Sequence, residues 1–215
     1  MSKFNSTIIL VSAFLYSFIV SFNKVEYLFL VPILFVMLYE YKNILTILKK
    51  LFFLNFFIGM LLLFLVLQGD IQNGINIYIR TNMIIFFNLL LFSKSSGYDI
   101  VRALNELRFP KEFVSSVYFS LKMIQTLSDE FKKIKQTLKV RGFRANSSLF
   151  AYETYGNLFG HIFVKSIKKA QSLQDSFELR GFNGRIYLIN SSNLSLNDLI
   201  LIFLIVALYV KEVIV

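Results

Sequence analysis

Four long apolar runs fill the first 92 residues of the chain, and a fifth lies near its C-terminus. They cover residues 7–22, 27–39, 51–67, 75–92 and 199–210. A helix that crosses a bilayer needs about 20 mostly apolar residues. The first two runs are shorter, so they must recruit flanking residues or thin the bilayer. The pattern predicts an all-α integral membrane protein with about five transmembrane helices.

The segment between the fourth and fifth runs is amphipathic, with apolar residues at helical spacing. A helix over 98–107 is expected first, and it ends at Phe109-Pro110. The first long stripe then comprises Leu121, Ile124, Leu127, Phe131, Ile134 and Leu138. The second comprises Tyr155, Leu158, Phe159, Ile162, Ser166, Ala170, Leu173 and Phe177. A helix over 111–140 would be about 45 Å long. The segment therefore predicts a platform of amphipathic helices that lies along the membrane.

The charges between the runs predict the topology of the chain. Residues 93–197 carry 16 Lys and Arg against 8 Asp and Glu, and the 40–50 loop is also net positive. The 23–26 loop is neutral and the 68–74 loop is negative. Because positively charged loops stay in the cytoplasm, the N-terminus and residues 93–197 are expected inside and the C-terminus outside. The first run is expected to be a retained span, since no small-x-small cleavage site follows Phe22.

The composition excludes most catalytic chemistry. The chain has 56% hydrophobic residues, no Cys and one His, so thiolate metal sites, disulfides and most metal or triad schemes are absent. His161 stands between Phe159 and Phe163, where a packing role is expected. The stretch GFNGR lacks the Gly-Lys-Ser/Thr of a phosphate-binding loop. No catalytic residue, cofactor or metal is predicted, and nucleic-acid binding is excluded because the apolar runs leave little soluble surface.

One cation lies inside an apolar run. Arg80 falls in the fourth run, with Asn76 one turn earlier on the same face, and an intramembrane Arg is by default a functional candidate. The favoured alternative is that Arg80 reaches water or pairs with Asp70. Asn82 and Asn88 are expected to bond to neighbouring helices.

A short motif occurs twice in the amphipathic segment. Residues 139–146 read KVRGFRAN and residues 178–185 read ELRGFNGR, so Arg-Gly-Phe closes each long helical stripe. Gly after a helix supplies a left-handed cap, and Arg in the last turn favours the helix dipole. Each copy also carries a second Arg, Arg144 or Arg185. A guanidinium held at a rigid helix end suits a carboxylate pocket on a partner, and two ends suit a partner present in two copies.

The pattern resembles the transmembrane T component of energy-coupling-factor (ECF) transporters, the CbiQ/EcfT-like family. The resemblance covers roughly residues 98–185 and includes the stretches FPKEFVSSVYFSLKMIQTLSDEFKKIKQTLKVRGF and LFGHIFVKSIKKAQSLQDSFELRGF. In that family two coupling helices end in Ala-Arg-Gly, and their arginines dock into two ABC-type ATPase subunits. The resemblance implies that Arg141 and Arg180 are the docking pair and that Gly142 and Gly181 cap the helices.

The sequence departs from the family at three places. Val140 and Leu179 stand where the family usually has Ala, which affects the fit in the ATPase groove. Gly160-His161 occupies a region where Pro is common, and Gly156 with Gly160 has the spacing of a close helix crossing.

The resemblance implies a non-catalytic coupling subunit that transmits ATPase motion to a membrane-embedded substrate-binding (S) subunit, for uptake of a vitamin or transition-metal ion. The expected location is a bacterial or archaeal cytoplasmic membrane. The expected division is residues 1–92, transmembrane; 93–197, cytoplasmic coupling helices; and 198–215, a last transmembrane helix. A membrane-anchored scaffold whose basic helices bind anionic lipid or a protein partner is the alternative function. The sequence leaves open whether the two ATPases are one chain used twice or two different chains.

Overall fold

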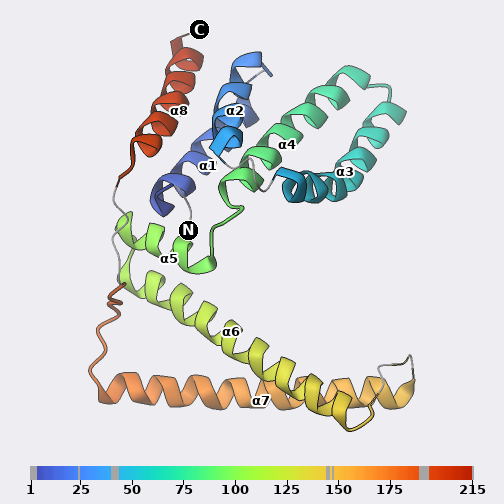
Figure 1. The fold of residues 1–215 in the computed structure, drawn as a ribbon, viewed down its shortest axis with the longest axis vertical. Helices are drawn as coiled ribbons and strands as arrows, with labels where there is room; N and C mark the ends of the chain where they lie inside the picture. The colour runs from blue at the N-terminus through green and yellow to red at the C-terminus, as the bar shows by residue number, and fades with distance from the viewer. Residues whose placement is uncertain are drawn as a thin grey trace. The chain divides into compact units, whose positions relative to one another are not determined.

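A computed structural model describes residues 4–23, 25–39, 44–143, 146, 148–188 and 194–214. Every regular element in these residues is helical (Figure 1). The elements are α1 (Ser6–Phe22), η1 (Tyr27–Phe29), α2 (Leu30–Tyr39), α3 (Ile44–Leu67), α4 (Ile71–Leu91), α5 (Gly97–Glu106), α6 (Lys111–Val140), α7 (Leu149–Leu179) and α8 (Leu196–Ile214). The all-α prediction is therefore confirmed for the described residues.

The chain forms two compact units. One comprises residues Met1–Leu107 and Leu188–Val215, and the other comprises Arg108–Tyr187. The first unit contains α1 to α5 and α8, and the second contains α6 and α7. The division at residues 92 and 197 concerns the side of the membrane on which each segment lies, and it stays a prediction.

The core of the first unit lies where α1, α2, α4 and α8 meet. Tyr16 and Phe87 are fully buried, and their ring centroids are 4.1 Å apart. The Tyr16 hydroxyl donates to the carbonyl of Phe29 at 2.9 Å, so the one polar atom of this side chain is satisfied inside the apolar core. Phe29, Val36, Leu90, Leu201 and Ile205 complete the set of well-buried large side chains around them.

Two contacts show that α1 and α8 run parallel. At their N-terminal ends, the backbone N–H of Asn5 donates to Asp198 at 3.0 Å. At their C-terminal ends, Lys211 pairs with Glu26. Asp198 is fully buried, and its other oxygen accepts from the N–H of Ser195 at 2.9 Å. One carboxylate therefore caps α8 and also holds the start of α1 against it.

Arg80 joins α4 to the C-terminal end of α1. Its guanidinium donates to the carbonyls of Ser21 at 3.0 Å and Asn23 at 2.8 Å. These carbonyls belong to the last turn of α1 and its cap, where the helix dipole favours a cation. Asp70 instead accepts from Asn73, so the alternative pairing of Arg80 with Asp70 is not observed.

The two asparagines of α4 that were expected to bond to neighbouring helices behave differently. Asn88 donates to Ser17 of α1 at 3.0 Å, as expected for a residue that bonds to a neighbouring helix. Asn82 donates instead to the carbonyl of Tyr78 in its own helix. With Arg80 on the last turn of α1 and Asn88 on Ser17, α4 runs antiparallel to α1.

Helix α3 packs on α4 and otherwise exposes apolar side chains. Phe52, Phe53 and Phe56 are each more than four-fifths exposed. Among the described residues, α3 and α4 are long and apolar enough to cross a membrane, whereas α1 and α2 are shorter apolar helices. A bare apolar surface of this extent suits lipid or another membrane helix as its neighbour, and does not suit water.

Candidate functional site

The second unit is an antiparallel pair of long helices held together by aromatic rings. The rings of Phe119 and Phe177 lie 4.7 Å apart by their centroids, and those of Phe131 and Phe159 lie 5.8 Å apart. Glu130 of α6 pairs with Lys165 at 3.2 Å and Lys169 at 3.8 Å, both from α7. Figure 1 shows α6 running at an angle to α7, with the two helices overlapping in this view toward the C-terminal end of α6.

Helix α6 ends in a Schellman cap. The N–H of Gly142 donates to the carbonyl of Lys139 at 3.1 Å, and that of Phe143 donates to Leu138 at 3.0 Å. Gly142 has φ +82°, the left-handed conformation that this cap requires and that Gly adopts without a Cβ penalty. The cap turns the chain sharply, so Arg141, the C-cap residue, is the last residue before the chain leaves the helix axis.

Helix α7 ends in the same way. The N–H of Gly181 donates to Glu178 at 3.2 Å, and that of Phe182 donates to Phe177 at 3.0 Å, with Gly181 at φ +60°. The rings of Phe177 and Phe182 stack with centroids 4.5 Å apart. This is the apolar contact that accompanies a Schellman motif. The repeated tripeptide is therefore a repeated backbone structure, with Arg180 in the place of Arg141.

The phenylalanine of each copy packs on the opposite helix. Phe143, at the end of α6, lies against Phe150 and Tyr155 near the start of α7, with centroid separations of 6.1 and 5.7 Å. Phe182, at the end of α7, lies against Phe119 of α6 at 5.9 Å. The two helix ends therefore lie at opposite ends of the pair.

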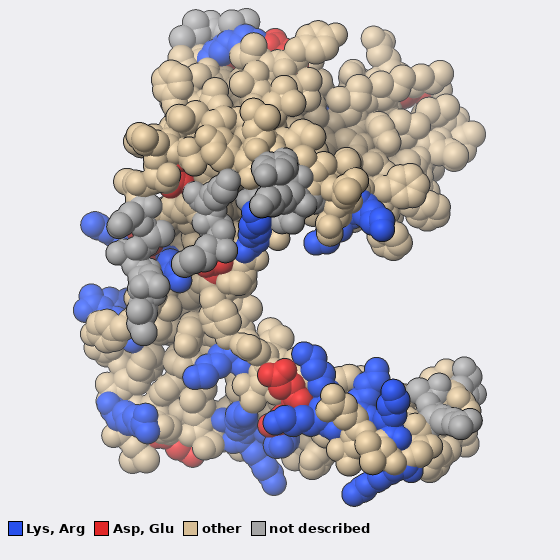
Figure 2. Space-filling model, viewed as in Figure 1, with Lys and Arg blue, Asp and Glu red and all other residues tan. Residues whose placement is uncertain are grey.

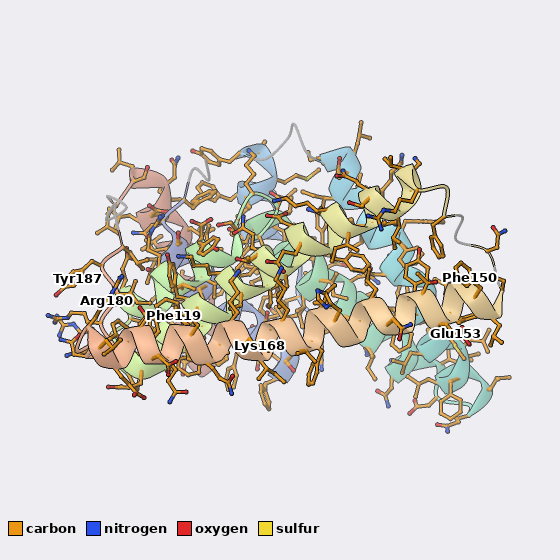
Figure 3. All side chains as sticks on the ribbon, turned by 90° about the horizontal axis from the view of Figure 1, so that it is seen from below. Phe119, Phe150, Glu153, Lys168, Arg180 and Tyr187 are labelled. Atoms are coloured by element: carbon orange, nitrogen blue, oxygen red, sulfur yellow. The ribbon has the colours of Figure 1, made fainter. Side chains whose placement is uncertain are left out.

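Arg141 and Arg180 lie at these ends, and neither has a partner among the residues that the structure describes. Both are exposed, and neither guanidinium has a hydrogen bond or ion pair with any residue that the structure describes. Figure 3 shows Arg180 at one end of α7 and Phe150 with Glu153 at the other. Since α7 has 31 residues, the ends are separated by a helix about 46 Å long.

The residue before each arginine is also exposed. Val140 is 87% exposed and Leu179 is 88% exposed, at equivalent positions of the two caps. Each helix end thus has an exposed apolar side chain next to an exposed guanidinium. Arg185 is exposed as well, and its N–H donates to the side chain of Asn183; Arg144 lies outside the described residues.

The remaining candidates do not form a site. His161 is exposed on α7, and the described residues contain no group of three or more His, Cys, Asp or Glu side chains that could hold a metal ion. A Cβ added at Gly156 or Gly160 would meet no atom within 4 Å, so the close crossing suggested by their spacing is not made with α6.

The cap glycines allow a direct test of the backbone argument. Gly142→Ala or Gly181→Ala should each lower the free energy of unfolding by about 1 kcal/mol, because an L-residue is strained at positive φ even where space is open. Gly156→Ala is the matched control. Its site is helical with open space, so alanine should stabilise by about 0.5–1 kcal/mol. Denaturant titration in detergent measures all three, and equal effects at the three glycines would contradict the cap assignment.

The apolar helices and the two-helix unit define a helical membrane protein with a separate, basic helix pair; Figure 2 shows Lys and Arg gathered over α6 and α7. The chain matches CbiQ, described as cobalt transport protein, over residues 1–188. It belongs to this family of membrane transport proteins, which confirms the resemblance drawn from the sequence.

A curated relative points to the same kind of protein. The chain is 27% identical over 124 residues to the energy-coupling factor transporter transmembrane protein EcfT of Listeria innocua serovar 6a. The match spans 53% of this chain and 47% of the relative, so it covers about half the length of each.

Proposed function

We propose that the chain is the transmembrane coupling subunit of an ECF-type importer. In this role it transmits the motion of two ABC-type ATPase subunits to a membrane-embedded S subunit. The observation that carries the proposal is the pair of identical caps, each of which holds at the end of a long helix an arginine with no partner among the described residues. A guanidinium without such an acceptor is available for a bidentate bond to a carboxylate on a partner.

The proposed coupling follows from the rigidity of the helix pair. ATP-driven closure would draw the two ATPases together, and each would carry one arginine with it. Because aromatic rings and the Glu130 ion pairs join α6 to α7, the pair would tilt or slide as packed helices do. The S subunit, not this chain, would bind the cargo, a vitamin or a transition-metal ion. ATP hydrolysis would belong to the partners, and this subunit would be non-catalytic.

The membrane arrangement is part of the proposal. Five spans, α1 to α4 and α8, would place the N-terminus and the α6–α7 pair in the cytoplasm and the C-terminus outside. The parallel packing of α1 with α8, and the antiparallel packing of α1 with α4, support this alternation of direction. The membrane would be the cytoplasmic membrane of a bacterium or archaeon.

The absence of cysteine makes the topology directly testable. A single cysteine at Gln68, between α3 and α4, should react with a membrane-impermeant maleimide in intact cells. A cysteine at Gln171, exposed on α7, should react only after the cells are permeabilised. The cysteine-free parent chain is the background control. Labelling of both positions in intact cells would overturn the proposed orientation.

Purification from native membranes tests the function itself. A tagged chain solubilised in mild detergent should retain two ABC-type ATPase subunits and a small hydrophobic membrane protein, identified by mass spectrometry. The same complex in vesicles should accumulate its cargo only with ATP. Retention of anionic lipid alone, or of partners without an ATPase, would favour the scaffold function and contradict the proposal.

A further inference from the structure

A pocket of about 310 Å³ lies between the start of α3 and the end of α4, within the first unit. The two helices lie side by side as a hairpin (Figure 1). Four apolar side chains form most of its wall, and the polar residues that line it are Lys50 of α3, Asn88 of α4 and Ser93, just after α4. Pockets for small ligands start at about 300 Å³, so this one is large enough for a small polar group.

Two of these polar residues have hydrogen-bonding capacity that the described residues do not use. The Ser93 hydroxyl is buried, and it has no hydrogen-bond partner among them. Lys50 is exposed, and no carboxylate of the described residues forms an ion pair with it. Asn88 differs, because its amide already donates to Ser17. An ammonium with three donors and a hydroxyl at one pocket suit an oxyanion such as a phosphate.

An apolar stripe continues from Lys50 along the same face of α3. Phe57, Leu61 and Phe64 follow it at helical spacing. Their side chains are 70%, 48% and 59% exposed, so the described part of the chain leaves much of each uncovered. From Lys50 to Phe64 the helix rises about 21 Å, and the hydrocarbon of one leaflet is about 15 Å thick. A polar site at one end and an apolar stripe of this length match the two parts of a phospholipid.

We propose that this pocket binds the headgroup of an anionic phospholipid, with an acyl chain along Phe57, Leu61 and Phe64. The phosphate accepts from Lys50 and Ser93, and so bridges α3 to the end of α4. A free phosphate would leave the apolar stripe uncovered. A zwitterionic lipid such as phosphatidylcholine carries its own cation, so it would leave the charge of Lys50 unmatched.

The proposed membrane arrangement decides the leaflet. It puts the start of α3 and the end of α4 at the cytoplasmic surface, where anionic lipids attract Lys and Arg and where basic pockets between membrane helices bind lipid headgroups. The lipid therefore belongs to the cytoplasmic leaflet. The site lies in the first unit and uses neither Arg141 nor Arg180, so the inference goes beyond the proposed function and does not depend on ATPase docking.

Native mass spectrometry of the full chain in mild detergent tests the inference. The delipidated protein is titrated with phosphatidylglycerol or with phosphatidylcholine of the same acyl chains. One phosphatidylglycerol should bind about fivefold more tightly than phosphatidylcholine, because a lysine beside an anionic headgroup contributes about that much. Lys50→Gln with Ser93→Ala should remove the preference, and Lys50→Arg, which keeps the cation, should retain it. Equal affinity of the unaltered chain for the two lipids would overturn the inference.

Lys49→Gln is the matched control. It removes the same charge from the neighbouring position of α3, but Lys49 lines a different hollow, with Phe52 and Asn55. The preference should survive, whereas equal losses in Lys49→Gln and the double variant would reveal only general attraction to basic residues and overturn the site. Excess inorganic phosphate should not displace the lipid, and dihexanoyl phosphatidylglycerol, with its short chains, should bind more weakly. Displacement by inorganic phosphate would overturn the lipid assignment.

Thermal unfolding supplies a second measurement. A ligand that binds only the folded chain raises Tm by mass action. Phosphatidylglycerol should therefore raise the Tm of the unaltered chain above the value with phosphatidylcholine, and the double variant should show no such difference. The same rise in both proteins would overturn the inference. Because no ATPase takes part in either experiment, failure of the inference would leave the proposed function standing.

Discussion

Replacement of both Arg141 and Arg180 by glutamate is expected to release the ATPase subunits and abolish uptake. Each change puts a carboxylate at an exposed position where the proposed ATPase partner also supplies a carboxylate, so a bidentate attraction becomes a repulsion. Loss of one partner of a desolvated charge pair costs about 2–5 kcal/mol, and two such sites act on one assembly. The amount of ATPase that co-purifies with the tagged chain, together with ATP-dependent uptake in vesicles, measures the effect.

The matched control has the same change in net charge, but places it in the middle of the two helices and not at their ends. Lys122→Glu with Lys168→Glu reverses two exposed cations in the middle of α6 and α7. This variant should retain the ATPases if the helix ends are the docking points. A scaffold held to lipid by general basicity would weaken similarly in both variants, and that result would exclude the docking role. Unchanged unfolding of the isolated subunit would show that neither variant acts by misfolding.

Replacement of Asp198 by alanine is expected to give the largest loss of stability in the first unit. The carboxylate is fully buried and accepts from the backbone N–H groups of Asn5 and Ser195. Alanine leaves both donors without this acceptor at the junction of α1 and α8, at a cost of about 3 kcal/mol. Denaturant titration in detergent measures the change, and separation of α1 from α8 should accompany it.

Asp99 is the natural comparison for Asp198. It forms a capping box with Ser96 at the start of α5, where its oxygen accepts from the Ser96 N–H at 2.8 Å in an exposed position. Asp99→Ala therefore loses a cap without leaving a buried donor, and about 1 kcal/mol is expected. Equal effects at the two aspartates would show that the bond between α1 and α8 contributes nothing.

The long helices of the second unit were predictable because strong local signals bound them. Helix α6 spans Lys111–Val140, as expected, since Pro110 precedes it and Gly142 provides the left-handed cap after it. The caps at Gly142 and Gly181 were also expected from the repeated tripeptide. No described residue pairs with either arginine, and the docking role remains a proposal.

Hydropathy predicted the membrane helices less well at their ends. Helix α3 begins at Ile44, before the apolar run that starts at residue 51, and it includes Lys49 and Lys50. Lysine is a good helix former, so the charge ends the apolar run without ending the helix. In the part of the chain that the structure describes, two helices have the length and composition of a span, and the count of five stays a proposal.

The apolar stripe of α6 was only partly buried. Ile124 lies in the stripe but is 63% exposed. The steps of the stripe average less than 3.6 residues, so the stripe drifts around the helix along its length. In the middle of α6, the side chains that line the groove against α7 include Phe119, Met123 and Thr126.

The acceptors of Arg80 could not be read from the sequence. Backbone carbonyls carry no residue signature, and Ser21 and Asn23 are more than 50 positions away from Arg80 along the chain. A sequence shows which side chains are acidic but not which backbone carbonyls are free, so the carboxylate of Asp70 was the partner that could be expected. The sequence therefore gives no sign that the partly buried Arg80 is paired with the end of a helix.

The two phenylalanines that follow the cap glycines have a mechanical consequence. Phe143 belongs to the end of α6 but rests on α7, and Phe182 belongs to the end of α7 but rests on α6. A force applied at Arg141 or Arg180 would therefore act on both helices, because a phenylalanine two residues further along contacts the other helix. Ring contacts therefore join α6 to α7 close to both arginines, so bending either helix end away from the pair would break apolar contacts.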